Sequence, residues 1–226
     1  MFDWVRKDLV DFGKLLEPKD ISKQLDEKIY DVAFIGAGLS STYTLIEFIN
    51  HINSQNLTIS ENGTLKIAIF ERDEWVWGGI PYGKRSGFTS LIITPLDEFL
   101  PDYELGSFME WMSKNFEWLI QPFKKVAGPR SLTWLKESET KILNCNSQNI
   151  HIPRYFFGIY LWDKLRETTQ NSKHKIEMSL IAEEVSSIQK VSDSNCKFSV
   201  KVNNADFYSK NIMLGIGIPN IRTLDS

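Results

Sequence analysis

The sequence has 226 residues, of which 42% are hydrophobic, and this is enough for one substantial core or for one domain and part of a second. The 26 basic and 29 acidic residues give a formal net charge of -3, so composition gives no reason to expect a nucleic acid or an acidic membrane surface as partner. Cys145 and Cys196 lack metal-ligand spacing and are too few for a disulfide framework, which suits a reducing cytosol.

Residues 1–28 are predicted to form an amphipathic helix and a linker that precede the main domain, residues 29–226. Apolar side chains recur at roughly helical spacing between Trp4 and Leu16. Charges run through this segment, so it is neither a secretory signal nor a spanning helix, and a cytoplasmic location is expected. The helix is expected to pack on the same domain or on missing chain; the alternative is a contact with a partner or a membrane surface.

The stretch 30–50, YDVAFIGAGLSSTYTLIEFIN, predicts a buried strand, a glycine turn and an amphipathic helix. A turn without side chains, followed by the N-terminus of a helix, is what a nucleotide diphosphate needs, because free N–H groups and the positive end of the helix dipole face the anion. The pattern is G-x-G-x-x-S, with Ser41 in place of the usual third glycine. Serine is small enough to keep the helix close to the strand.

A second strand is predicted at Lys66–Phe70, and it ends in Glu71. An acid at this position can accept hydrogen bonds from the hydroxyl groups of an adenosine ribose. The interval from the glycine turn exceeds the common spacing of about 20 residues because a polar excursion intervenes. Arg72 could stack near an adenine or tolerate a ribose 2′-phosphate, but the Glu71 carboxylate would repel that phosphate, so FAD or NAD is favoured over NADP.

Glycine and aromatic residues fill the next stretch, WVWGGIPYGKRSGF. It could run close to a cofactor, with Trp75, Trp77, Ile80 and Tyr82 covering an apolar ring, or it could be an ordinary surface loop. A helix is predicted at Glu104–Leu119, followed by a polar connection.

The C-terminal third is predicted to hold a helix and then several strands. The helix lies in IPRYFFGIYLWDKLRETT, and Arg154 before it could reach a phosphate or be a surface charge. Ile181–Ile188 and Cys196–Val202 are predicted as paired strands, and Asn211–Leu214 as a strand that leads into a second glycine turn.

Four segments together resemble the FAD/NAD(P)-binding flavoprotein superfamily, and within it the FAD-NAD(P)-binding family related to flavin-dependent N-hydroxylating monooxygenases. They are FIGAGLSS, IFERD with GGIPYG, RYFFGIYLWDKL and NIMLGIGIPN, and the resemblance covers about residues 29–219. It implies a Rossmann-like three-layer α/β fold with a parallel sheet and a small antiparallel β meander. Where the family usually has Ala-Thr-Gly, this sequence reads Gly-Ile-Gly, so the threonine hydroxyl is missing.

The resemblance also assigns roles to residues. It places Gly36, Gly38 and Ser40 against the FAD diphosphate, Glu71 at the adenosine ribose and the main chain of Val185 at the adenine. The full set expected to bind the cofactor is Gly36, Ala37, Gly38, Leu39, Ser40, Glu71, Arg72, Val185, Gly215 and Gly217.

The sequence thus predicts an FAD-binding oxidoreductase, such as a flavin-dependent monooxygenase or an NAD(P)H-linked redox enzyme, or one part of it. The NAD(P)H site of such enzymes is not contained in these residues, so the chain is a fragment, a shortened relative or a subunit whose protein partner completes the flavin site. The alternatives are a non-catalytic nucleotide-binding subunit and an NAD-dependent dehydrogenase. No catalytic residue, metal site or particular substrate is indicated: His51, His151 and His174 have no acid or cysteine partner discernible in the sequence.

Overall fold

The structure is a computed structural model that describes residues 4–13, 29–55, 63–73, 76–192, 195–203 and 205–217. The described helices are α1 (Lys7–Phe12), α3 (Leu39–Gln55), α4 (Gly79–Tyr82), the 3-10 helix η1 (Lys84–Ser86), α5 (Leu96–Phe99), α6 (Asp102–Leu119), α7 (Gln121–Val126), α8 (Pro129–Leu143) and α9 (Arg154–Gln170). The described strands are β1 (Ile29–Ile35), β2 (Thr64–Phe70), β3 (Lys175–Ile181), β4 (Ser187–Lys190), β5 (Phe198–Val202) and β6 (Ala205–Leu214).

The strands form one sheet with the order β3-β2-β1-β6-β5-β4. The pairs β3–β2, β2–β1 and β1–β6 are parallel, whereas β6–β5 and β5–β4 are antiparallel. Ile35 at the end of β1 lies beside Phe70 of β2 on one side and Leu214 of β6 on the other. The C-terminal ends of three parallel strands therefore lie side by side. Ligands bind just beyond these strand ends in open α/β sheets.

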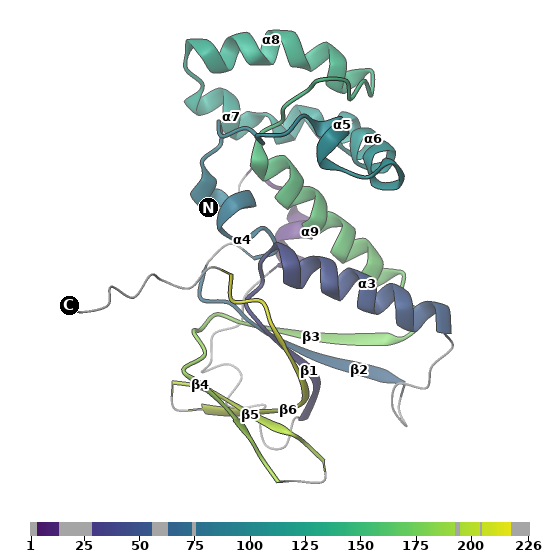
Figure 1. Cartoon of the computed structure of the whole chain (residues 1–226), viewed down its shortest axis with the longest axis vertical. Helices are drawn as coiled ribbons and strands as arrows, with labels where there is room; N and C mark the ends of the chain where they lie inside the picture. The colour runs from purple at the N-terminus through teal and green to yellow at the C-terminus, as the bar shows by residue number, and fades with distance from the viewer. Residues whose placement is uncertain are drawn as a thin grey trace, which may run out of the picture.

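The predicted three-layer α/β architecture is confirmed. Helices α3 and α9 pack on each other and cover one face of the parallel strands, and the β4–β5–β6 meander curls below the other face (Figure 1). The larger core, which includes Leu45, Ile49 and Leu161, lies on the helix side. The smaller core lies on the meander side, where the rings of Phe70 and Phe207 meet edge to face.

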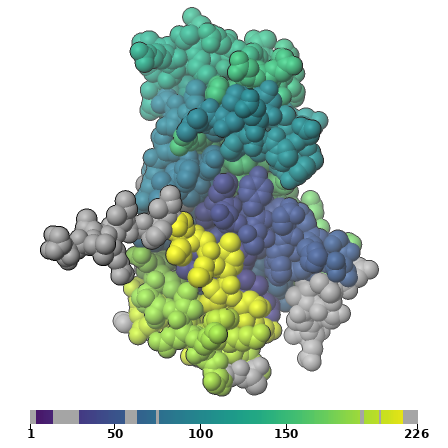
Figure 2. Space-filling model, viewed as in Figure 1, coloured from purple at the N-terminus to yellow at the C-terminus, as the bar shows by residue number. Residues whose placement is uncertain are grey.

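Helices α6, α7 and α8 gather at the end of the molecule opposite the meander (Figures 1 and 2). The helix predicted at Glu104–Leu119 is confirmed as α6, which buries Phe108, Met112 and Phe116. The polar connection predicted after it is wrong, because α7 and α8 occupy most of that stretch. Helix α8 buries only Leu135, Ser138 and Ile142, so its apolar stripe is too sparse to be read as a helix.

The strand predicted at Ile181–Ile188 is also wrong. Strand β3 ends at Ile181, and the next strand, β4, begins at Ser187. These two strands lie at opposite edges of the sheet, so the residues between them must cross from one edge to the other. The pairing predicted with the following strand holds only at the end of the range, where Ser187 and Ile188 oppose Lys201 and Val200.

Helix α1 packs against α9 rather than standing alone. Leu9 is fully buried, and the Trp4 ring meets the Tyr155 ring edge to face. The Arg6 guanidinium donates to the buried Asp163 carboxylate at 3.0 Å. The rest of the predicted N-terminal helix, with Leu16, lies outside the described residues, and the domain boundary at residue 28 stays a prediction.

Candidate functional site

The first glycine turn closes directly over the ends of β1 and β2. The Gly36 N–H donates to the Phe70 carbonyl at 2.8 Å. Gly36 has a φ of 94°, and a Cβ there would lie 2.4 Å from the carbonyl oxygen of Gly215. Both the backbone angle and the close approach require glycine at this position.

The second glycine turn follows β6 and lies against the first. Its Gly215 N–H donates to the Ile35 carbonyl at 2.8 Å. A Cβ on Gly215 would lie 2.0 Å from the hydroxyl oxygen of Ser41, which is itself buried in α3. The serine in place of the third glycine is thus accommodated by a glycine on the neighbouring strand end. Gly217 has a φ of 68°, and no heavy atom of the described residues lies within 4 Å of its Cβ position.

The chain after β2 packs on the same turn. The Trp77 N–H donates to the Ala37 carbonyl at 2.7 Å, and the Thr42 hydroxyl donates to the Trp77 carbonyl at 2.9 Å. Gly79, with a φ of 59°, is so close that its Cβ position lies 3.2 Å from the Cα of Gly38. Sequence reasoning missed Thr42 and Gly79 as residues that hold the turn; the repeated glycine in WGGIPYG was the available signal.

Four backbone N–H groups at the start of α3 have no acceptor among the described residues: those of Gly38, Leu39, Ser40 and Ser41. They form the first turn of a 17-residue helix, where such groups have no partner within the helix itself. Together with the positive end of the helix dipole, they suit a diphosphate. The φ of Gly38 is not positive, and its Cβ position meets only the Cα of Gly79, at 3.8 Å, so no side chain of the described residues fills this space.

The Glu71 carboxylate is held in place by the backbone. One oxygen accepts the Ala37 N–H at 2.8 Å, and the other accepts the Asp73 N–H at 2.9 Å. Each carboxylate oxygen has two lone pairs, so both keep one acceptor position for a ribose hydroxyl. The N–H of Ala37 is therefore committed to Glu71, whereas those of the next four residues are not.

Arg72 and Val185 lie near Glu71, beyond the C-terminal ends of the parallel strands β2 and β3. The Glu71 N–H donates to the Ile181 carbonyl at 3.0 Å, and Arg72 pairs with Glu184 at 2.8 Å. Val185 follows Glu184 in the crossing between β3 and β4 and packs on the smaller core. The predicted adenine-contacting residue is thus next to the partner of Arg72.

Other candidates lie elsewhere. Trp77 is fully buried and stacks on Phe12 of α1, so it belongs to the core, whereas Trp75 lies outside the described residues. Ile80 is exposed, and Tyr82 packs on Phe157, where burial raises the pKa of its hydroxyl.

Arg154 forms hydrogen bonds to backbone carbonyl groups of its own chain. Its guanidinium donates to the Leu91 carbonyl at 3.1 Å, and its backbone N–H donates to the Ser90 carbonyl. Both bonds attach the start of α9 to the segment that follows η1.

A family model described as FAD-NAD(P)-binding matches residues 33–219, which include both glycine turns, Glu71 and Val185. The predicted cofactor, FAD, is confirmed by this match, whereas the NAD(P)H site expected outside these residues stays a prediction.

Relatives of this chain include uncharacterized proteins of Mycobacterium tuberculosis (strain H37Rv) and Mycobacterium bovis. Each is 32% identical over 136 residues, which is 60% of this chain and 25% of the relative. The chain thus spans about a quarter of the length of the curated relatives that it matches.

Solved structures with a similar arrangement include an ornithine N-hydroxylase of Kutzneria sp. 744, with 16% identity and a TM-score of 0.40 over 83% of this chain and 37% of that one. Another is an L-lysine 6-monooxygenase of Pseudomonas syringae, with 14% identity and a TM-score of 0.35 over 85% of this chain and 38% of that one. Both TM-scores are below 0.5. Within the ranges that the structure describes, no helix is both long and apolar enough to cross a bilayer.

Proposed function

Because this chain belongs to the FAD-NAD(P)-binding family, we propose that it holds FAD at the paired glycine turns and acts as the FAD-binding part of an oxidoreductase. One observation carries the proposal: N–H groups at the start of α3 that find no acceptor in the described part of the chain lie beside a glutamate that backbone N–H groups hold in place. The first would hold the diphosphate and the second the adenosine ribose.

Each residue of the site has a binding or positioning role in this proposal. Gly38, Leu39 and Ser40 bind the diphosphate through backbone N–H groups, and Glu71 accepts the ribose hydroxyls. The main chain near Val185 faces the adenine, and Arg72 stacks at its edge while paired with Glu184. Gly215 and Gly217 approach the flavin nucleotide from the end of β6.

When bound, FAD supplies the redox chemistry, and the protein supplies orientation and electrostatics. We propose a flavin-dependent monooxygenase or another NAD(P)H-linked enzyme as the finer activity, in the cytoplasm that the two cysteines suit. The NAD(P)H site would lie outside these residues, on further chain or on a partner protein.

A titration of the full chain with FAD, followed by flavin fluorescence, tests the binding proposal. The sharpest variant is Gly38→Ala, because the protein itself has room for this methyl group, whereas a diphosphate against the backbone does not. We expect the variant to keep the melting temperature of the parent protein and to lose FAD affinity. Unchanged FAD affinity in Gly38→Ala would show that this turn is not the site.

Addition of NAD(P)H to the FAD-loaded chain separates the functional alternatives. Bleaching of the visible flavin band is expected if the chain is a redox-competent unit. A yellow protein that NAD(P)H does not bleach would instead be a non-catalytic nucleotide-binding subunit or one half of an enzyme. A colourless protein that NAD stabilises and FAD does not would be an NAD-dependent dehydrogenase.

A further inference from the structure

Trp77 has a backbone conformation that is unusual for a large side chain. Its φ is 75°, in the left-handed region that favours glycine, and its side chain is fully buried. The indole N–H is buried as well and has no hydrogen-bond partner among the described residues. A left-handed backbone and an unpaired buried donor are each unfavourable, so neighbouring groups must hold Trp77 in this conformation.

The backbone of Trp77 is hydrogen-bonded to the first glycine turn and to α3. Its N–H donates to the Ala37 carbonyl at 2.7 Å, and its carbonyl accepts the Thr42 hydroxyl at 2.9 Å. The Ala37 carbonyl belongs to the same peptide group as the Gly38 N–H. Because this group is planar and trans, its N–H points away from its carbonyl, so the bond from Trp77 fixes the direction of the Gly38 N–H. Trp77 thus orients one of the donors that the proposed FAD diphosphate requires.

Residues 4–13, which include α1, form an N-terminal strap across the segment 77–88. The Phe12 ring stacks on the Trp77 ring, with their centroids 6.2 Å apart. The Trp4 ring meets the Phe88 ring edge to face, with their centroids 5.8 Å apart. The strap therefore contacts both ends of the segment that contains α4 and η1.

Both an ion pair and apolar packing hold the strap on α9. The Arg6 guanidinium donates to the buried Asp163 carboxylate at 3.0 Å. Leu9 is fully buried, and a Cβ on Gly13 would lie 2.3 Å from the Trp162 ring. The end of the strap thus lies directly against α9.

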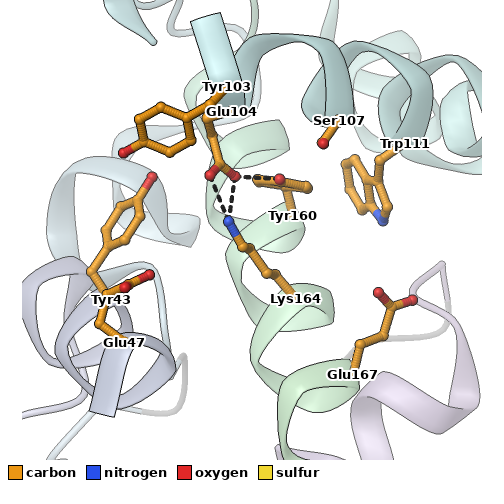
Figure 3. A pocket seen from close by; sticks show the side chains of 9 residues that line it. All are labelled: Tyr43, Glu47, Tyr103, Glu104, Ser107, Trp111, Tyr160, Lys164 and Glu167. Carbon is orange, nitrogen blue, oxygen red and sulfur yellow. Dashed lines mark hydrogen bonds and ion pairs between the residues drawn. The ribbon is translucent and has the colours of Figure 1, made fainter. Parts of the chain in front are cut away.

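Asp163 keeps other partners if the strap detaches. The Arg166 guanidinium donates to it at 2.7 Å, and the Trp111 indole N–H donates to it at 2.8 Å. Trp111 also lines a groove with a volume of about 510 Å³ between α3, α6 and α9, into which the Lys164 side chain extends (Figure 3). Loss of the Arg6 contact would leave no unpaired buried carboxylate, which is the costly outcome when a buried ion pair is broken. The helices beneath the strap can therefore keep their arrangement without it.

We propose that the N-terminal strap controls FAD retention: while it is docked, Phe12 keeps Trp77 in its strained conformation, and Trp77 keeps the Gly38 N–H directed at the diphosphate. This inference rests on the proposed function, because it takes FAD as the ligand of the glycine turn. When the strap detaches, Trp77 relaxes and releases the Ala37 carbonyl, which lowers FAD affinity. Coupling between two sites is reciprocal, so bound FAD also holds the strap in place. Phe12 and Trp77 are thus positioning residues that act through the glycine turn.

A fluorescence titration of full-chain variants with FAD is the first test. The affinity of Phe12→Ala should fall at least about fivefold, because the Trp77 ring loses its stacking partner. Phe12→Tyr keeps the ring and should bind FAD as the parent protein does. Ile142→Ala is the matched control, since it removes a buried side chain of α8, at the end of the molecule opposite the meander (Figure 1). It should lower the melting temperature without a loss of FAD affinity.

Hydrogen exchange with and without saturating FAD is the second test. It follows backbone amides of the strap, such as those of Val10 and Gly13, which donate to the carbonyls of Arg6 and Leu9. FAD should slow their exchange at least about fivefold. The amides of α8 are the internal reference and should slow less, because a general stabilisation of the fold would act on both helices.

The two tests separate failure of the strap proposal from failure of the proposed function. A parent chain that binds no FAD would overturn both. If the parent binds FAD, three results would overturn the strap proposal alone: an unchanged affinity in Phe12→Ala, an equal loss of affinity in Phe12→Tyr or Ile142→Ala, or strap amides that FAD slows no more than those of α8.

Discussion

Single glycines decide how closely the two turns approach. Gly36 and Gly63 both have a positive φ, 94° and 64°, but only Gly36 has a backbone atom within reach of a new Cβ. The sequence alone predicts Gly36 from its motif. It cannot show that the atom in contact belongs to Gly215, because that contact depends on β6 pairing with β1.

We predict that Gly36→Ala is more destabilising than Gly63→Ala. The left-handed backbone costs each variant roughly 1–2 kcal/mol. In Gly36→Ala the methyl group must also displace the Gly215 carbonyl, which adds about 1–3 kcal/mol. Denaturant unfolding of the full chain measures both free energies. Equal losses in the two variants would contradict the close contact between the turns.

We predict that the Glu71 carboxylate contributes directly to FAD binding through the adenosine ribose. Glu71→Ala should weaken FAD binding by about 1–3 kcal/mol, since charge-assisted hydrogen bonds are lost. Glu184→Ala is the control, because it removes a neighbouring exposed carboxylate that pairs only with exposed Arg72 among the described contacts. That pair contributes about 0–1 kcal/mol. If both variants bound FAD equally well in a fluorescence titration, the ribose role of Glu71 would be wrong.

At the scale of elements, helix α9 supports the site through α4. A Cβ on Gly158 of α9 would lie 2.2 Å from the Tyr82 carbonyl, and α4 begins at Gly79, which touches Gly38. The β1–α3–β2 unit could be predicted because its apolar periods are strong. Strand β3 and helix α8 could not, since β3 is fully buried only at its last three residues and α8 is mostly polar. Apolar residues at helical spacing predict helix α9, although the helix is buried on nearly all of its sides.

Two glycines inside helices should respond in opposite directions to alanine. Gly158→Ala should lower the free energy of unfolding by about 1–3 kcal/mol, because the methyl group forces α4 away from α9. Gly106→Ala in α6 should raise it by about 0.5–1 kcal/mol, because, apart from the backbone of α6 itself, no atom of the described residues lies within 4 Å of the new methyl group, and alanine favours the helix. Thermal and denaturant unfolding give both signs. A neutral Gly158→Ala would argue against the α4–α9 contact.

At the scale of the whole molecule, the fold brings residues that are far apart in the sequence together at the C-terminal ends of the parallel strands. Gly36 and Gly215 meet there, and Glu71 is held beside them. Through the family resemblance, the sequence assigns both glycine turns and Glu71 to one cofactor, but it does not predict that Gly36 and Gly215 approach each other so closely. The groove between α3, α6 and α9 was not predictable, because its lining residues come from three helices, and the sequence has no periodic pattern that shows how these helices pack on one another.

The packing of the whole chain also shields the hydroxyl groups of most of its tyrosines from solvent. Burial is the largest cause that raises the pKa of five hydroxyl groups above the ordinary value of 10.0: Tyr30, Tyr43, Tyr82, Tyr155 and Tyr160. The folded state favours their neutral form, so they leave the free energy of unfolding unchanged below pH 10.0 and lower it above that pH.

An alkaline titration followed by tyrosinate absorbance checks this expectation. Most of the absorbance change should appear only together with loss of tertiary circular dichroism, because the buried hydroxyls ionise when the chain unfolds. Full ionisation near pH 10.0 in a chain that is still folded would contradict the burial of these side chains.

The most direct test of the account is the identity of the small molecule that the full chain retains. Native purification, with FAD supplied before the last step, followed by denaturation and mass spectrometry of the released material, gives that identity. We predict FAD in near-equal amount to the protein, and much less from Gly38→Ala. Release of NAD without FAD, or of no nucleotide at all, would contradict the assignment of the paired glycine turns to FAD.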